Sequence, residues 1–223
     1  MITIMKLTYF NGKGIAETSR ILLAVAGVDY EDFRYPLTIN DWKTYNFTRD
    51  EFDKDKADGK LWKSMGKLPF LEVNGKVISQ SKAIERYIAN RYNLMGNNLE
   101  DSAVIDSYCE WLRDFKTAYH SEKRKPNKEE AMNNWFNKLL VDKLKNFENI
   151  ISHKGEDMSG YTVGNKLSLI DISIYTFLTE YFDNKEGILN AYKDCPKLKS
   201  IVNTVSENDK VKHWLKTRPV GSY

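Results

Sequence analysis

Cysteine is scarce in this chain of 223 residues, where Cys109 and Cys195 are the two examples. They lie far apart, and neither belongs to a C-x-x-C pair. A fold stabilised by a disulfide framework needs more cysteines, and a cysteine-based zinc site needs closely spaced pairs such as C-x-x-C. The sequence therefore argues against both kinds of site.

The chain also lacks long apolar runs and a strong excess of one charge. No apolar segment approaches the ~20 residues that span a bilayer, and the first ten residues, MITIMKLTYF, lack the basic start and long apolar core of a signal peptide. The net charge is +3, with lysines and acidic residues interspersed, so the basic stripe of a nucleic-acid binder is missing. We therefore expect no nucleic-acid partner, no membrane partner and, by default, a location in the cytosol.

Strand and helix patterns alternate in the first 96 residues. Period-two alternation predicts strands, apolar side chains at helical spacing predict helices, and Asn74-Gly75 is a strong signal for a two-residue hairpin turn. The predicted elements are a strand at 4–10, a helix at 16–26 ended by Gly27, a strand at 28–35, hairpin strands at 69–73 and 76–79, and a helix at 81–93. Residues 37–65 are polar and irregular, and we expect a long loop there with at most one helical turn. This order indicates a small mixed sheet with helices.

The pattern changes after Gly96, where helical periodicity replaces strand alternation. Residues 170–182 are apolar on nearly every side, which predicts a buried central helix. Ser168 and Asp171 stand at the spacing of a capping box in front of it. We therefore predict two domains, an α/β domain at 1–96 and an all-helical domain at 98–223.

The turn after the first strand carries Tyr9, Gly12 and Gly14. Tyr9 alone is most simply a strand-end core or interface residue. The two glycines suggest a phosphate loop, yet the G-x-x-x-x-G-K-[ST] pattern is absent. The third glycine of a dinucleotide-binding turn and its acidic partner are missing too. Both nucleotide interpretations are therefore set aside.

Lys67-Leu68-Pro69 stands at the head of an otherwise apolar strand. A proline there removes a donor from the strand ladder, and a cis bond would turn the backbone of Leu68 toward a ligand. The free N–H and C=O of Leu68 could then pair with an extended peptide. An edge-strand proline without any ligand is an equally good interpretation.

Gln80-Ser81 lies at the start of a predicted helix. Free N–H groups and the positive end of the helix dipole favour a carboxylate there, although a plain N-cap is the usual explanation for such a serine. Taken together, the three places describe a receptor for a small acidic peptide. One edge pairs with its backbone, one helix end takes its carboxylate, and the hydroxyl of Tyr9 faces its reactive atom.

In this order and context, the Tyr, Leu-Pro and Gln-Ser set resembles cytosolic glutathione transferases with an active-site tyrosine, the sigma and alpha classes most closely. The matching segments are LTYFNGKGIAETSRILLA, GKLPFLEVNGKVISQSKAIERYIANRYNL, DSYCEWLRDF and VGNKLSLIDISIY, which span nearly the whole chain. The resemblance implies a glutathione transferase fold: a thioredoxin-like domain that binds glutathione, and an all-helical domain that shapes an apolar pocket. It also implies a homodimer.

The resemblance assigns roles to residues of this sequence. Tyr9 falls on the catalytic tyrosine, whose hydroxyl donates a hydrogen bond to the glutathione sulfur and favours the thiolate. Leu68 would pair with the cysteinyl backbone, while Gln80 and Ser81 would hold the γ-glutamyl end. Asp114 falls where relatives send a carboxylate across the dimer interface to the glutathione amino group. Glutathione is then a cosubstrate, and no metal or other cofactor is implied.

The segment 37–65 departs from the pattern of the sigma class, because it is longer. Sigma relatives place a tryptophan and a lysine there to hold the glycyl carboxylate of glutathione. Counting back from the Leu-Pro pair assigns Lys60 and Trp42 to these roles, with Lys63 and Trp62 as rivals.

A second departure lies beside the tyrosine. Relatives often carry arginine directly after the second glycine of the turn, whereas this chain has Ile15. With one positive charge fewer near the sulfur, we expect a smaller shift of the thiol pKa. The leading hypothesis is a transferase that conjugates glutathione to apolar electrophiles. The alternatives are a non-catalytic binding or structural member of the fold, and a glutathione-dependent peroxidase or prostaglandin isomerase.

Overall fold

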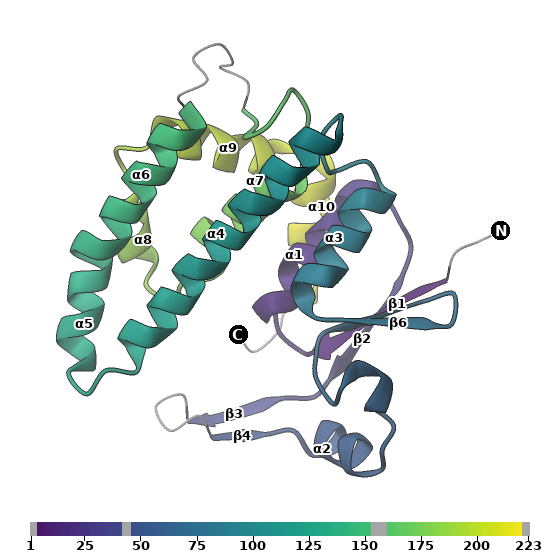
Figure 1. Ribbon diagram of the computed structural model, residues 1–223. Coiled ribbons are helices and arrows are strands. Elements are labelled where there is room, and N and C mark those ends of the chain that lie inside the picture. The colour runs from purple at the N-terminus through teal and green to yellow at the C-terminus, as the bar shows by residue number, and fades with distance from the viewer. Residues whose placement is uncertain (1–3, 42–45, 153–159, 220–223) are drawn as a thin grey trace. The chain divides into compact units, whose positions relative to one another are not determined.

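The computed structural model describes residues 4–41, 46–152 and 160–219. The chain divides into two compact units (Figure 1). One unit comprises Met1–Tyr92 together with Lys210–Tyr223, and the other comprises Asn93–Asp209. The last helix of the chain therefore packs with the N-terminal unit.

A four-stranded mixed sheet forms the centre of the first unit, as the sequence predicts. Its strands are β1 (Met5–Phe10), β2 (Glu31–Tyr35), β5 (Phe70–Val73) and β6 (Lys76–Ser79). Their order is β2-β1-β5-β6, with β2 parallel to β1 and the other pairs antiparallel. Asn74 and Gly75 both have positive φ, 48° and 78°, as the predicted two-residue turn requires.

Helices lie on both faces of this sheet (Figure 1). The helices of the first unit are the 3-10 turn η1 (Gly14–Ala16), α1 (Glu17–Ala26), α2 (Asp50–Ala57), α3 (Ser81–Arg91) and α10 (Asp209–Thr217). α1 and α3 lie against one face, where the alternate β1 residues Met5 and Leu7 are buried, and α2 lies at the other face. α1 ends at Gly27 in the left-handed conformation, as predicted.

The expectation of a loop at 37–65 is wrong. β3 (Thr38–Asp41) and β4 (Asn46–Thr48) form a separate antiparallel pair, followed by α2 and by the 3-10 turn η2 (Trp62–Ser64). Phe52 is the buried residue of α2, which is otherwise rich in charge, so its sequence shows no apolar periodicity. The exposed strand pair leaves no alternation signal either.

The second unit is all-helical over its described residues, as predicted. Its helices are α4 (Leu99–Lys123), α5 (Lys128–Asn134), a π-helical turn η3 (Trp135–Leu139), α6 (Leu140–Ser152), α7 (Leu169–Thr179), α8 (Lys185–Ala191) and α9 (Pro196–Glu207). α7 is buried at each residue from Leu169 to Leu178, and the capping box of Ser168 and Asp171 forms at its start. Both sequence predictions for this helix are confirmed.

The described residues, 4–41, 46–152 and 160–219, contain neither a helix that could span a membrane nor a cluster of metal-binding side chains. None of the helices found there combines the length and the apolar character needed to cross a bilayer. The same residues contain no group of three or more His, Cys, Asp or Glu side chains able to hold a metal ion.

Candidate active site

Tyr9 lies near the end of β1 on the sheet face that α1 covers, and its side chain is half-buried. Burial raises the pKa of Tyr9, while a hydrogen bond from the backbone of Ile15 and the positive charge of Arg20 partly oppose that rise. The Arg20 guanidinium carbon lies 5.8 Å from the centre of the Tyr9 ring. The hydroxyl therefore keeps its proton at neutral pH and can act as a hydrogen-bond donor.

Gly14 allows this tyrosine to approach the turn closely. Its φ is +44°, and a Cβ at this position would lie 2.5 Å from the Tyr9 hydroxyl oxygen and 2.8 Å from its Cε1 atom. Any larger residue would collide with the ring and strain the backbone. Gly14 is therefore needed to make room for the Tyr9 ring. This need explains the glycine in the turn without a phosphate ligand.

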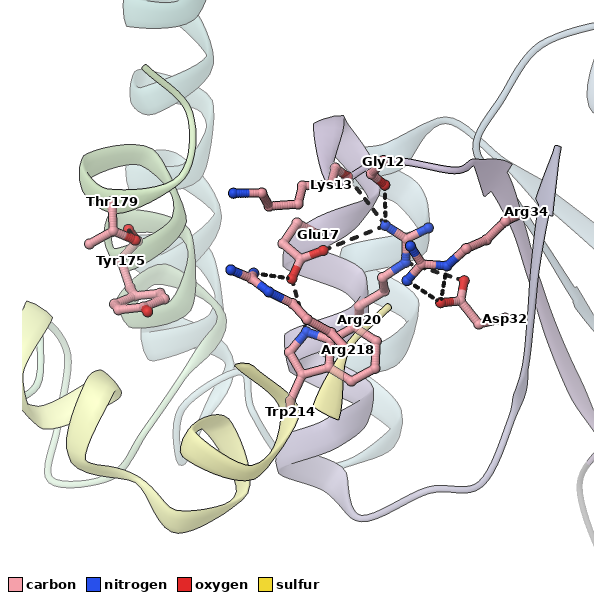
Figure 2. Close-up of polar contacts among 10 residues, drawn as sticks. All are labelled: Gly12, Lys13, Glu17, Arg20, Asp32, Arg34, Tyr175, Thr179, Trp214 and Arg218. Atoms are coloured by element: carbon pink, nitrogen blue, oxygen red, sulfur yellow. Dashed lines mark hydrogen bonds and ion pairs between the residues drawn. The ribbon is translucent and has the colours of Figure 1, made fainter. Parts of the chain in front are cut away.

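Arg20 holds the turn at Gly12 and Lys13 in place through hydrogen bonds (Figure 2). It is fully buried, and its Nη1 donates to the carbonyl oxygens of Gly12 at 2.6 Å and Lys13 at 3.3 Å. Its Nε donates to Asp32 of β2 at 3.2 Å. The loop that carries Gly14 is therefore tied both to α1 and to the sheet.

Glu17 completes the buried network shown in Figure 2. It is 3% exposed, and its Oε2 lies 3.5 Å from Nη1 of Arg20. Its Oε1 accepts hydrogen bonds from Trp214 Nε1 at 2.9 Å and from Arg218 Nη1 at 2.8 Å. Sequence reasoning missed this network, because a Glu and an Arg three residues apart normally mark the solvent face of a helix.

The Leu68–Pro69 peptide bond is cis. Pro69 is buried, Lys67 is exposed, and β5 begins at Phe70. In the part of the chain that the structure describes, no hydrogen bond engages the N–H or C=O of Leu68. Both groups are therefore available to an extended peptide, as the sequence-based hypothesis requires.

Gln80 precedes α3 with φ 72°, a conformation that non-glycine residues rarely adopt. Its side chain is exposed and makes no capping hydrogen bond. Ser81 is the first residue of the helix rather than its N-cap, so the plain N-cap interpretation of this serine is wrong. Among the described residues, neither side chain has a hydrogen-bond partner, and both are available to a ligand.

The register of the strands brings Tyr9, the Leu68–Pro69 segment and Gln80 to one end of the sheet. Phe70 of β5 lies between Thr8 of β1 and the last residue of β6. The next residues along the three segments are Tyr9, Pro69 and Gln80. A phenolic donor, an open backbone edge and a helix N-terminus thus share one end of the sheet.

The structure does not test whether the remaining predicted residues belong to this site. Lys60 is exposed, with its ammonium 2.6 Å from Asp55 and 3.4 Å from Asp58. Trp42 lies outside the described residues. The rival Trp62 is 73% exposed. Asp114 is exposed on α4, in the second unit.

Comparisons with known proteins match both halves of the chain. The model described as "Glutathione S-transferase, N-terminal domain" matches residues 5–90, and "Glutathione S-transferase, C-terminal domain" matches residues 110–218. Glutathione S-transferase alpha-5 of Rattus norvegicus is 33% identical over 218 residues, and glutathione S-transferase A1 of Homo sapiens is 31% identical over 215 residues. Each alignment covers 94% of this chain and 87% of the relative.

A solved structure agrees with this result. The crystal structure of monomeric Na-GST-3, a glutathione S-transferase from the hookworm Necator americanus, is similar with a TM-score of 0.78 and 28% identity. The similarity covers 98% of this chain and 99% of that chain. The mixed sheet of the first unit is the thioredoxin-like domain of this fold, and the second unit is its helical domain. The chain belongs to the glutathione S-transferase family.

Proposed function

We propose that this protein joins the thiolate of glutathione to apolar electrophiles. The observation that carries the proposal is the position of the Tyr9 hydroxyl, at the same end of the sheet as the unused backbone groups of Leu68 and the start of α3. Burial raises the pKa of this hydroxyl, so it is a hydrogen-bond donor at neutral pH. Leu68 pairs with the cysteinyl backbone of glutathione. Gln80 and Ser81 hold the γ-glutamyl carboxylate at the helix N-terminus.

The magnitudes suffice for catalysis. A free thiol has a pKa of about 8.5, so only a few per cent is thiolate at neutral pH. A hydrogen bond to a charged group contributes roughly 1.5–3 kcal/mol, and one pKa unit corresponds to about 1.36 kcal/mol. Donation from Tyr9 therefore lowers the thiol pKa by about one to two units and makes the thiolate a major species.

The chemical step needs no protein nucleophile. The thiol proton leaves to solvent, the sulfur lone pair attacks the electrophilic carbon, and the leaving group departs with the electrons of its bond. The hydroxyl of Tyr9 keeps its own proton throughout and holds the sulfur by a hydrogen bond. The two cysteines of the chain are buried and take no part.

A homodimer is part of the same proposal. Trp62 and Met65 are 73% and 61% exposed, close together on the turn before β5. Two large apolar side chains in such a short exposed segment suit burial against a second copy. Asp114 then contributes its carboxylate to the glutathione amino group across the interface, and Lys60 and Trp42 remain the residues proposed for the glycyl carboxylate. We also expect the protein to act in the cytosol.

Turnover of 1-chloro-2,4-dinitrobenzene with glutathione tests the catalytic proposal. Tyr9→Phe should lower kcat at least ten-fold and raise the pKa of the bound thiol, while retention on immobilised glutathione persists. Tyr87→Phe, the same substitution on α3, is the matched control and should leave kcat unchanged. A wild-type protein that binds glutathione but shows no turnover of any electrophile or peroxide is instead a binding member of the family.

Sedimentation velocity tests the homodimer. The wild type should sediment as a dimer, and Trp62→Ser should shift the population toward monomer. A wild-type protein that stays monomeric at micromolar concentration contradicts the dimer and, with it, the role of Asp114.

A further inference from the structure

Arg20 is a fully buried cation close to the proposed catalytic tyrosine. Its guanidinium carbon lies 5.8 Å from the centre of the Tyr9 ring, inside the limit of about 6 Å for a cation–π contact. Burial raises the pKa of Tyr9, while the backbone hydrogen bond from Ile15 and the positive charge of Arg20 oppose the rise. A cation beside a phenol favours its charged form, so the hydroxyl becomes a stronger hydrogen-bond donor.

Hydrogen bonds hold this cation in place (Figure 2). Nε of Arg20 donates to Asp32, and Nη1 donates to the carbonyl oxygens of Gly12 and Lys13. The two carbonyl groups belong to the turn that packs against the Tyr9 ring. One guanidinium therefore fixes the turn against the tyrosine and also fixes its own distance from the ring.

The acidic side chains around Arg20 do not cancel its charge. Asp32 also accepts hydrogen bonds from Arg34 at 2.9 and 2.6 Å, and Glu17 also accepts one from Arg218 at 2.8 Å. Three arginines therefore share two carboxylates in this cluster. Nη2 of Arg20 is buried and has no hydrogen-bond partner among the described residues. The cluster thus keeps an excess of positive charge next to the tyrosine ring.

We infer that Arg20 is a positioning residue for the transfer reaction, which sets both the place and the donor strength of the Tyr9 hydroxyl. Ile15, whose backbone hydrogen bonds to that hydroxyl, has an uncharged side chain, so the buried guanidinium supplies the positive charge that favours the thiolate. Arg20 acts through the tyrosine, because its own side chain is fully buried. The inference rests on the proposed function, since the thiolate belongs to bound glutathione.

The pKa of the thiol in bound glutathione measures this effect. The ultraviolet absorbance of the thiolate is titrated in protein saturated with glutathione. Arg20→Gln removes the charge and keeps a polar side chain. It should raise the thiol pKa by about 0.5–1 unit, because a buried charge acts over several ångströms through an effective dielectric constant of about 20. Arg20→Lys restores the charge and should abolish most of this rise, even where the altered hydrogen bonds lower kcat.

Asp32→Asn tests the same charge with Arg20 in place. It removes an anion that lies 3.2 Å from Nε of Arg20, so the positive potential at Tyr9 increases and the thiol pKa should fall below the wild-type value. A role confined to holding the turn predicts the opposite sign, because a loosened turn weakens the hydrogen bond from Tyr9 and raises the thiol pKa. This variant decides the inference if Arg20→Gln does not fold.

Arg49→Gln is the matched control. The Arg49 guanidinium carbon lies 5.3 Å from the centre of the Phe52 ring, and its side chain is exposed, so the same substitution at another cation–π contact should leave the thiol pKa unchanged. The inference is overturned if folded Arg20→Gln keeps the wild-type thiol pKa or if Asp32→Asn fails to lower it. A wild-type protein that binds glutathione without lowering its thiol pKa contradicts the proposed function itself, before any variant is compared.

Discussion

The indole Nε1 of Trp214 donates a hydrogen bond of 2.9 Å to Glu17, which lies 197 residues earlier in the chain. Arg218 binds the same carboxylate oxygen at 2.8 Å. These contacts join α10 to the first turn of α1, beside the loop that positions Tyr9. The C-terminal helix is thus part of the thioredoxin-like unit, and its anchor is one buried carboxylate.

Glu17→Gln should strongly destabilise this unit. The substitution leaves Arg20, fully buried, and Arg218, 18% exposed, without their common anion. Removal of one partner of a buried ion pair costs about 3–5 kcal/mol. Urea denaturation followed by circular dichroism measures the change. Glu31→Gln, which removes the exposed partner of Lys6, should cost less than about 1 kcal/mol, and an equal loss in both variants would contradict the buried network.

Gly14→Ala should impair catalysis more than folding. The new Cβ would lie 2.5 Å from the Tyr9 hydroxyl oxygen, so the ring must move away from the sulfur position. Misplacement by about 1 Å can cost ~100-fold in rate, and we expect kcat to fall at least ten-fold in steady-state assays.

Gly59 offers a matched control for this substitution. Its φ is +73°, but an added Cβ would meet no atom within 4 Å. Gly59→Ala therefore shares the backbone strain of Gly14→Ala, about 1 kcal/mol, without the collision. If both variants lose activity equally, strain rather than contact with Tyr9 explains the effect.

Ile15→Arg should lower the pKa of the glutathione thiol. Ile15 is 46% exposed, so a longer side chain fits, and its backbone already binds the Tyr9 hydroxyl. A positive charge within about 4–6 Å of an anion lowers its pKa by one unit or more. Ultraviolet titration of the bound thiolate measures the shift, and Ile4→Arg, at a 77% exposed site before β1, is the control. Identical thiol pKa values in wild type and Ile15→Arg would refute the expected effect of this position.

Local sequence signals predicted the parts of the fold that depend on local chemistry. The Asn74-Gly75 turn and the capping box of Ser168 and Asp171 follow from backbone geometry within four residues, and both formed as predicted. The three candidate site segments, at Tyr9, Leu68 and Gln80, were selected from the same kind of local signal, and their roles stay predictions.

Contacts between residues far apart in the sequence left no local signal of this kind. Arg20 stands in a helical sequence whose neighbours give no hint that its guanidinium braces the Gly12 turn. The α2 helix buries only Phe52, so neither periodicity nor apolar content marks it. A cleft lined by Thr8, Phe33 and Phe70 lies where strands and turns far apart in the sequence meet in space, which a linear pattern does not encode.

Cys195 should resist alkylation in the folded protein. It is fully buried, and burial, with the nearby charge of Glu148, raises the pKa of its thiol to about 11. The thiolate is the reactive form, so iodoacetamide at pH 8 should leave Cys195 unmodified in the native state and modify it in urea. Mass spectrometry of the digested protein distinguishes the two results.

The raised pKa of the Cys195 thiol also predicts that the stability of the protein depends on pH. The folded thiol holds its proton to higher pH than the unfolded thiol, whose pKa is about 8.5. Between this value and about 11 the folded state binds more protons, so the free energy of unfolding falls as pH rises through this interval. Cys195→Ser has no thiol to titrate, and its urea midpoint should decline less over this interval. Parallel declines in both proteins would show that the folded environment does not perturb this thiol.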